Sequence, residues 1–219
     1  MKESIYTIPL NDLFSEKCGC PLCRLDGMIR KRYTEFIMGP AMMSPEIRIE
    51  TNKKGFCPEH YRELLKCNNK LSLALMTQTR LETLTDAMDA RRPNLKKLKE
   101  LTSGCYLCEK EEASRKQIYN NILSTFRKER DFRESFSEQE YLCLPHYIKL
   151  LEEASVLSKS DRTVFSEAAY TLFMKGEKEV KRKVDHFSFM FDYRNQSEDA
   201  DWGDAREALL DADVFLNKE

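Results

Sequence analysis

Glycine, proline and net charge are all scarce in this sequence. Its 219 residues include only seven glycines and seven prolines, which is few for an all-β fold that depends on many tight turns. The net charge of −1 gives no global attraction to nucleic acid or to an anionic membrane. No stretch approaches the ~18 to 20 apolar residues that a membrane helix needs. These absences favour a soluble, helix-rich protein without nucleic-acid or membrane partners.

Several catalytic motifs are also missing. The sequence contains no HExxH, no HxE…PCxxC deaminase pattern, no GxSxG and no glycine-rich phosphate loop. It therefore favours a non-enzymatic role and leaves an enzyme as an alternative.

The compartment affects how the eight cysteines are interpreted. Residues 1–12 hold no apolar run that could serve as a signal peptide, so we expect a cytoplasmic protein. In a reducing compartment cysteines more often bind metals or undergo redox chemistry than form disulfides.

A cysteine–histidine pattern occurs twice. The sequence contains CxxC at Cys20–Cys23 and again at Cys105–Cys108, and CxxH at Cys57–His60 and again at Cys143–His146. The second CxxC lies 85 residues after the first, and the second CxxH lies 86 residues after the first. This near-constant offset predicts an internal duplication into two related halves.

Each copy of the pattern supplies three thiols and one imidazole, the ligand set of a closed tetrahedral zinc site. Pairing the motifs in chain order predicts one site from Cys20, Cys23, Cys57 and His60, and a second from Cys105, Cys108, Cys143 and His146. Two Zn²⁺ per chain would then stabilise the fold, and four protein ligands at each site leave no open position for catalysis.

Cys18 complicates the first site because it stands two residues before Cys20. A fifth thiol permits ligand exchange, and additional cysteines also suit an iron–sulfur cluster. Cys18 is therefore a bystander, an alternative ligand or a redox-active thiol, and an iron–sulfur cluster is the alternative cofactor.

Hydrophobic spacing predicts an all-α fold. On the long helix expected over 70–90, Leu71, Leu75, Leu81, Leu84 and Met88 hold helical spacing. Further helices are expected over 23–38, 58–66, 95–101 and 109–130, after His146, and from a cap at Ser160-Asp161 to about Tyr193. Residues 41–55 and 131–141 are expected as loops that deliver the second ligand pairs.

The expected organisation is tandem. Residues 1–92 form the first helical half with its metal knuckle, and residues 93–194 form the second. Residues 195–219 form an acidic tail with a short helix, which could bind a partner.

The first loop offers a candidate ligand site. Within residues 42–52, Arg48 could bind a carboxylate or a phosphate, Asn52 adds a polar group, and the methionines could line an adaptable surface. Alternatively, the methionines fill the core and Arg48 pairs with a neighbouring glutamate.

Four segments resemble one known family. They are residues 1–9, the Cys18–Cys23 run CGCPLC, residues 39–43 and residues 51–57. In these segments the chain resembles a bacterial family catalogued as domain of unknown function 6062, over nearly its whole length. The resemblance implies a bacterial cytoplasmic protein with cysteine–histidine metal sites, and it implies no activity.

The combined hypothesis is a zinc-stabilised binding or adaptor protein that acts on protein partners or forms a homo-oligomer. One alternative is a redox or metal-responsive sensor that uses Cys18 and Cys20. Another is an enzyme or small-ligand carrier that uses the loop from Met42 to Asn52.

Overall fold

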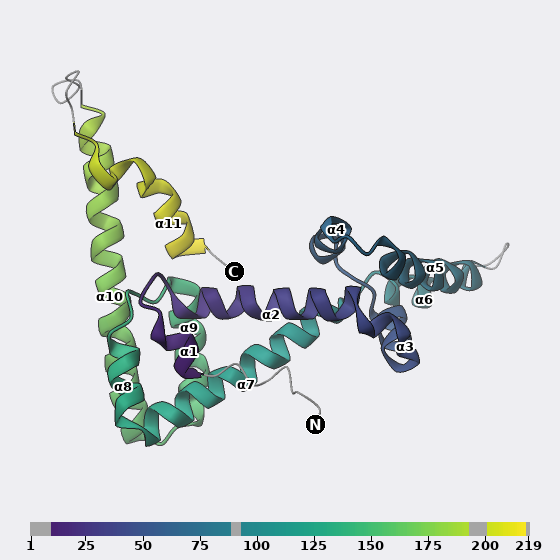
Figure 1. Ribbon diagram of the computed structural model, residues 1–219, viewed down its shortest axis with the longest axis horizontal. Helices are drawn as coiled ribbons and strands as arrows, with labels where there is room; N and C mark the ends of the chain where they lie inside the picture. Colours follow the sequence, from purple (N-terminus) through teal and green to yellow (C-terminus); the bar gives the residue numbers. More distant parts are fainter. Residues whose placement is uncertain (1–9, 89–92, 193–200, 218–219) are drawn as a thin grey trace. The chain divides into compact units, whose positions relative to one another are not determined.

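The computed structural model describes residues 10–88, 93–192 and 201–217, and within these ranges the protein contains helices and no strands (Figure 1). The all-α prediction is therefore confirmed. In the same ranges, no helix is both long enough and apolar enough to cross a membrane.

The chain divides into two compact units that are not sequential halves. A continuous unit comprises residues 27–115, and a discontinuous unit comprises residues 1–26 together with 116–219. Two long helices, α2 (Pro21–Met38) and α7 (Tyr106–Lys128), each begin in one unit and end in the other. The boundaries expected after residues 92 and 194 lie outside the described residues. The continuous unit is thus inserted into the discontinuous one.

The continuous unit contains four short elements around one longer helix. These elements are η1 (Pro40–Met43), α3 (Pro45–Lys54), α4 (Pro58–Lys66), α5 (Lys70–Ala87) and α6 (Leu95–Glu100). Helix α5 packs against each of the other four.

Helix α3 lies where the sequence predicts a loop over 41–55, so that prediction is wrong. Pro45 occupies the first turn of α3, where its missing N–H is tolerated. Gly55 ends the helix with φ +65° and donates its N–H to the carbonyl of Thr51 at 2.8 Å. The proline and glycine that suggested a loop are the start and stop signals of a helix.

The buried face of α5 differs from the apolar stripe that predicted the helix. The residues that α5 buries are Ser72, Leu73, Met76 and Ala87. Leu71 and Leu81 of the stripe are 60% and 55% exposed. The sequence therefore predicts the helix correctly, but most of its apolar stripe lies in solvent.

The discontinuous unit is built around phenylalanines. Its elements, besides its parts of α2 and α7, are α1 (Leu10–Ser15), α8 (Arg130–Ser137), α9 (Leu144–Glu153), η2 (Ala154–Val156), α10 (Lys159–Met190), η4 (Gly203–Glu207) and α11 (Ala208–Asn217). Phe14, Phe126, Phe136 and Phe165 form a buried cluster with ring centroids 5.1 to 5.8 Å apart. Phe132 extends this cluster from α8, so the loop predicted over 131–141 is largely a helix that the core requires.

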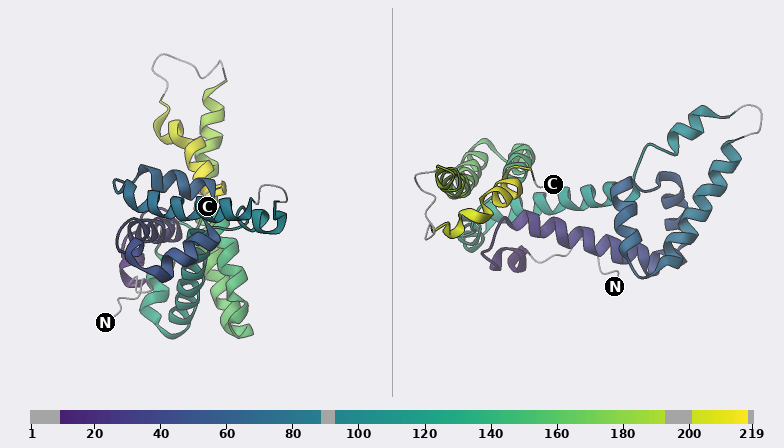
Figure 2. Two further views of the ribbon diagram at one scale, coloured as in Figure 1. Left: turned by 90° about the vertical axis from the view of Figure 1, so that its right-hand side faces the viewer. Right: turned by 90° about the horizontal axis from the view of Figure 1, so that it is seen from above.

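Helix α10 begins earlier than expected, because its N-cap is Ser158, whose side chain accepts the N–H of Asp161 at 3.2 Å. The described part of the acidic tail folds back along α10 as η4 and α11 (Figure 2). Lys183 pairs with Asp211 at 2.7 Å, and Arg182 pairs with Asp204. The expected short helix is therefore present, and these acidic residues are used within the chain.

Candidate metal centres

The eight cysteine and histidine ligands meet in two groups of four. The Cys20 group consists of Cys20, Cys23, Cys143 and His146, and the Cys57 group consists of Cys57, His60, Cys105 and Cys108. Within each group the ligand atoms all lie within 4.8 Å of one another. The predicted pairing in chain order is therefore wrong, because each CxxC meets the CxxH of the other copy.

Each group forms where the first turns of two helices meet. Cys57 is the N-cap residue of α4, and Cys143 is the N-cap residue of α9. The CxxC pairs lie at the start of α2 and α7. Because helix N-termini carry partial positive charge, this placement favours thiolates over thiols.

The Cys20 group is mostly buried. His146 Nδ1 lies 3.0 Å from the Sγ of Cys143, 3.4 Å from that of Cys23 and 3.6 Å from that of Cys20. The Sγ atoms of Cys23 and Cys143 are 3.6 Å apart. One nitrogen of the imidazole thus faces all three sulfurs.

The Cys57 group has the same internal arrangement with a more open edge. His60 Nδ1 lies 3.2 Å from Cys57 Sγ and 3.4 Å from the Sγ atoms of Cys105 and Cys108. Cys57 and Cys108 have their Sγ atoms 3.8 Å apart, and Cys108 is exposed.

A carboxylate orients each histidine. The Nε2 of His146 lies 2.8 Å from Asp26 Oδ2, and the Nε2 of His60 lies 3.1 Å from Glu111 Oε1. Such partners fix the tautomer and ring orientation of metal-binding histidines. Sequence reasoning missed both acids, although a signal was present: each stands three residues after its CxxC, and the two are again 85 residues apart.

The thiol pKa values show why these groups need positive charge. Burial opposes ionisation of Cys105, but hydrogen bonds from His60 and from backbone amides lower its pKa to about 6. Burial and the neighbouring Cys105 raise the pKa of Cys108 to about 12. The pKa of Cys23 is likewise raised by Cys143 and Cys20. In each group one thiolate therefore suppresses ionisation of another, and a bound cation relieves that repulsion.

The histidines respond in the complementary sense. Cys105 and Glu111 raise the pKa of His60 to about 11. Burial opposes the charged form of His146, but Asp26 and Cys143 raise its pKa to about 11. Both donor sets therefore stabilise a positive charge at their centres.

The donor sets also fit a metal ion by their dimensions. Tetrahedral zinc–thiolate bonds of about 2.3 Å place neighbouring sulfurs about 3.8 Å apart. The recorded sulfur separations of 3.6 and 3.8 Å agree with this spacing. The two Cys3His groups could therefore each hold a metal ion.

Hydrogen bonds between the ligand-bearing segments support both groups. In the continuous unit, the N–H of Tyr106 donates to the carbonyl of Gly55 at 2.9 Å. Arg80 donates from its guanidinium to the carbonyls of Asn52, Lys53 and Leu101, at the ends of α3 and α6. In the discontinuous unit, the N–H of Gly19 donates to the carboxylate of Glu140.

Cys18 belongs to neither group. It is exposed, and its Sγ lies 3.7 Å from Nη1 of Arg24, whose guanidinium also donates to the carbonyls of Leu13 and Glu16. Arg24 thus holds the segment before Cys20, and the alternative-ligand role of Cys18 stays a prediction.

Arg48 and Asn52 both lie on α3 and hydrogen-bond to α5. Arg48 Nη2 donates to Thr79 at 3.1 Å, and Asn52 Nδ2 donates to Thr83 at 2.9 Å. Asn52, but not Arg48, also lines a hollow of about 580 Å³ beside Arg80 and Lys97. The structure thus gives both side chains a packing role, and ligand binding by them stays a prediction.

Fold and site together define an all-helical protein with two Cys3His groups that could hold metal ions. The chain belongs to the family of unknown function DUF6062, which matches residues 1–219. It is also similar to an uncharacterized 23.9 kDa protein in the xynA 3′ region of Caldicellulosiruptor sp. (strain Rt8B.4). The identity is 23% over 176 residues, covering 80% of this chain and 86% of that protein. No solved structure matches the chain.

Proposed function

We propose that this protein is a non-enzymatic binding or adaptor protein whose helical surfaces are held in place by two structural zinc ions. The observation that carries the metal assignment is the completeness of each donor set. Three sulfurs and one imidazole nitrogen converge, and a carboxylate holds the other imidazole nitrogen. Four protein ligands leave no coordination position for a substrate, which is typical of structural zinc.

Bound zinc would supply folding free energy rather than reactivity. Structural zinc contributes on the order of 10 kcal/mol or more of apparent folding free energy, against typical domain stabilities of about 5–15 kcal/mol. The protein's own residues provide the N-terminal helix turns, the oriented imidazoles and the thiols.

Metal analysis and an absorbance spectrum of anaerobically purified protein test this proposal. The expected result is two zinc per chain, no visible absorbance band, and loss of helical circular dichroism when a strong chelator removes the metal. A Cys18→Ser variant is the matched control and should retain both ions. Iron with a broad band near 400 nm, roughly where thiolate–iron clusters absorb, would replace the proposal with a redox protein. Unchanged circular dichroism after confirmed metal removal would also contradict it.

The exposure of Cys108 favours a redox-responsive sensor as the second candidate. Its sulfur lies 3.8 Å from that of Cys57, at the open edge of its group. Peroxide could take two electrons from this thiolate pair, forming a disulfide and releasing zinc, while the peroxide is reduced to water.

Zinc release under mild peroxide distinguishes the two candidates. A sensor releases one zinc rapidly and takes it up again after thiol reduction. A protein whose two zinc sites are purely structural retains both ions under the same treatment.

A further inference from the structure

Arg80 of α5 is a half-buried cation that has hydrogen-bond donors to spare. Its guanidinium donates to the carbonyls of Asn52, Lys53 and Leu101, where α3 and α6 end. These bonds need at most three of the five N–H donors of an arginine, so at least two donors remain for another acceptor. Among the described residues, no carboxylate forms an ion pair with Arg80.

The charge of Arg80 is therefore not balanced by an acid. Burial lowers the pKa of Arg80 below its ordinary value. Burial also opposes the charged form of Arg30, but there Glu111 and Glu59 raise the pKa instead. The carbonyls around Arg80 supply only partial negative charge, so this guanidinium can still be stabilised by an anion.

Arg80 lines a hollow of about 580 Å³ in which cations outnumber acids. The cationic side chains of the lining are Lys53, Lys54, Arg80 and Lys97. The acidic ones are Asp86, Glu100 and Glu109. Lys54 pairs with Glu109, which leaves three cations against two acids. This small excess attracts a small anion, whereas the two acids disfavour a polyanion such as nucleic acid.

The same hollow also has an apolar side. Ile49 of α3 and Leu101 at the end of α6 both line it, and Ile49 is 68% exposed. The volume lies within the range of about 300–1,000 Å³ that is usual for small-molecule sites. A bare ion would leave most of this space to water, so the hollow suits an anion that carries an apolar group.

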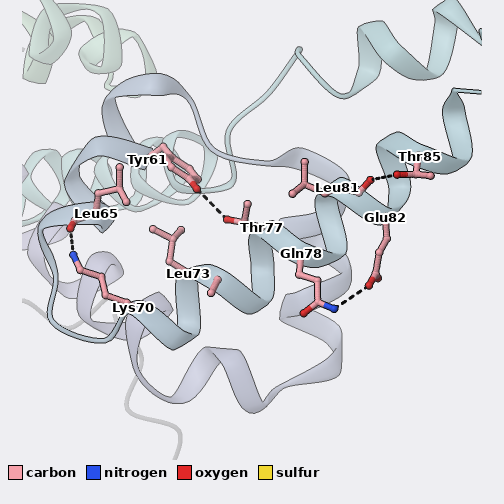
Figure 3. Close-up of a pocket in the computed structure, with 10 residues that line it drawn as sticks. Tyr61, Leu65, Lys70, Leu73, Thr77, Gln78, Leu81, Glu82 and Thr85 are labelled. Carbon is pink, nitrogen blue, oxygen red and sulfur yellow. Dashed lines mark hydrogen bonds between the residues drawn. The ribbon is translucent and has the colours of Figure 1, made fainter.

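The hollow between α4 and α5 has a similar volume, about 550 Å³, but no excess of charge (Figure 3). Its charged residues are Lys70 and Glu82. Lys70 donates to the carbonyl of Leu65, and Glu82 accepts a hydrogen bond from Gln78 at 3.2 Å. One cation and one acid, both already hydrogen-bonded within the chain, give that hollow no preference for an anion.

We propose that the hollow beside Arg80 binds a small molecule that carries a phosphate group. The three terminal oxygens of a phosphate match the three available cations, whereas a carboxylate offers two oxygens. Arg80 uses its remaining N–H donors, Lys53 and Lys97 neutralise the charge, and the organic part lies against Ile49. The inference goes beyond the proposed function, because it adds a small-molecule ligand to a protein whose partners are expected to be proteins.

An NMR titration of the full-length, zinc-loaded chain with phenyl phosphate tests this site at constant ionic strength. We expect saturable shifts of the amides around Lys53 and Leu101, with a dissociation constant on the order of 1 mM. Benzoate has the same ring with a carboxylate and should bind at least about fivefold more weakly. The absence of saturable shifts at these amides overturns the site, and equal binding of benzoate overturns the phosphate assignment.

Paired lysine variants supply a matched control. Lys53→Gln combined with Lys97→Gln should weaken the binding of phenyl phosphate at least about fivefold, because two charges are lost from the lining. Lys96→Gln combined with Lys99→Gln removes the same charge from α6 at positions outside the lining and should leave the affinity unchanged. Equal affinities in the two variants overturn the proposal.

Arg80→Lys tests the guanidinium itself, because it keeps the charge and loses the planar pair of donors. It should weaken phenyl phosphate about tenfold or more. Arg80 also holds the ends of α3 and α6, so zinc content and circular dichroism are measured on the same sample. A folded Arg80→Lys variant that binds as tightly as the wild type overturns the role of Arg80, and if this variant unfolds, the lysine pairs decide the proposal.

Discussion

The Cys57 and Cys20 groups share one ligand pattern but differ in which part of the group is exposed to solvent, the thiols or the carboxylate behind the histidine. In the Cys57 group the carboxylate is buried, with Glu111 1% exposed, and the thiol of Cys108 is exposed. In the Cys20 group Asp26 is 18% exposed, and the thiols of Cys20 and Cys143 are buried. The comparison shows that the first turns of two helices are sufficient to assemble a Cys3His group, whichever edge faces solvent.

The two groups also close very different lengths of chain. The ligand pairs of the Cys57 group are 45 to 51 residues apart, whereas those of the Cys20 group are 120 to 126 residues apart. The loop that the Cys57 group closes lies within the continuous unit. The Cys20 group instead joins the two chain segments of the discontinuous unit.

Removing one ligand from each group should have the largest effect. Cys143→Ser and Cys57→Ser should each retain one zinc and lower the free energy of unfolding of the affected unit by roughly 5 kcal/mol or more, because structural zinc contributes most of the stability of such small units. In hydrogen exchange, Cys143→Ser should deprotect the start of α2, and Cys57→Ser should deprotect the start of α7. If Cys143→Ser instead deprotects α7, the pairing is the sequential one.

Neutralising the two carboxylates should have a smaller effect. Glu111→Gln and Asp26→Asn should each weaken zinc binding by about 10- to 100-fold, the usual effect of losing a partner of a metal-binding histidine. We expect the larger loss at Glu111, because this carboxylate is more deeply buried and its other oxygen lies 3.6 Å from Arg115. Competition with a chelator measures both affinities. The exposed Glu112→Gln is the control, and a larger loss for Asp26→Asn would contradict this ranking.

Substitutions at two glycines should have effects of similar or smaller size, and their signs should be opposite. A Cβ at Gly176 of α10 would lie 2.5 Å from Cβ of Tyr141 and 2.9 Å from Phe215, so Gly176→Ala should destabilise the discontinuous unit by about 1–3 kcal/mol. A Cβ at Gly27 of α2 meets nothing within 4 Å, so Gly27→Ala should stabilise the protein by about 0.5–1 kcal/mol. Thermal unfolding of metal-loaded protein checks both. A stabilising Gly176→Ala would show that α11 does not pack against α10 as described.

The sequence predicts these sites only as far as local geometry determines them. The spacing of Cys57 and His60 reflects the first turn of one helix, so the motif and α4 were predictable. Which CxxC meets which CxxH depends on packing between distant helices, and two copies of one pattern are compatible with either pairing. Asp26 and Glu111 were accessible from their shared offset. Helix α3 was missed because Pro45 and Gly55 signal a loop as readily as the ends of a helix.

The exchange of partners between the two motif copies has a consequence for synthesis of the chain. On the ribosome, Cys57 and His60 emerge long before Cys143, which follows Cys23 by 120 residues. At about 5–20 residues per second, synthesis of the chain from His60 to Cys143 lasts roughly ten seconds. During that time the first CxxC has a complete but non-native set of partners within reach. A nascent chain that captures zinc in this early arrangement must release it before the discontinuous unit can close.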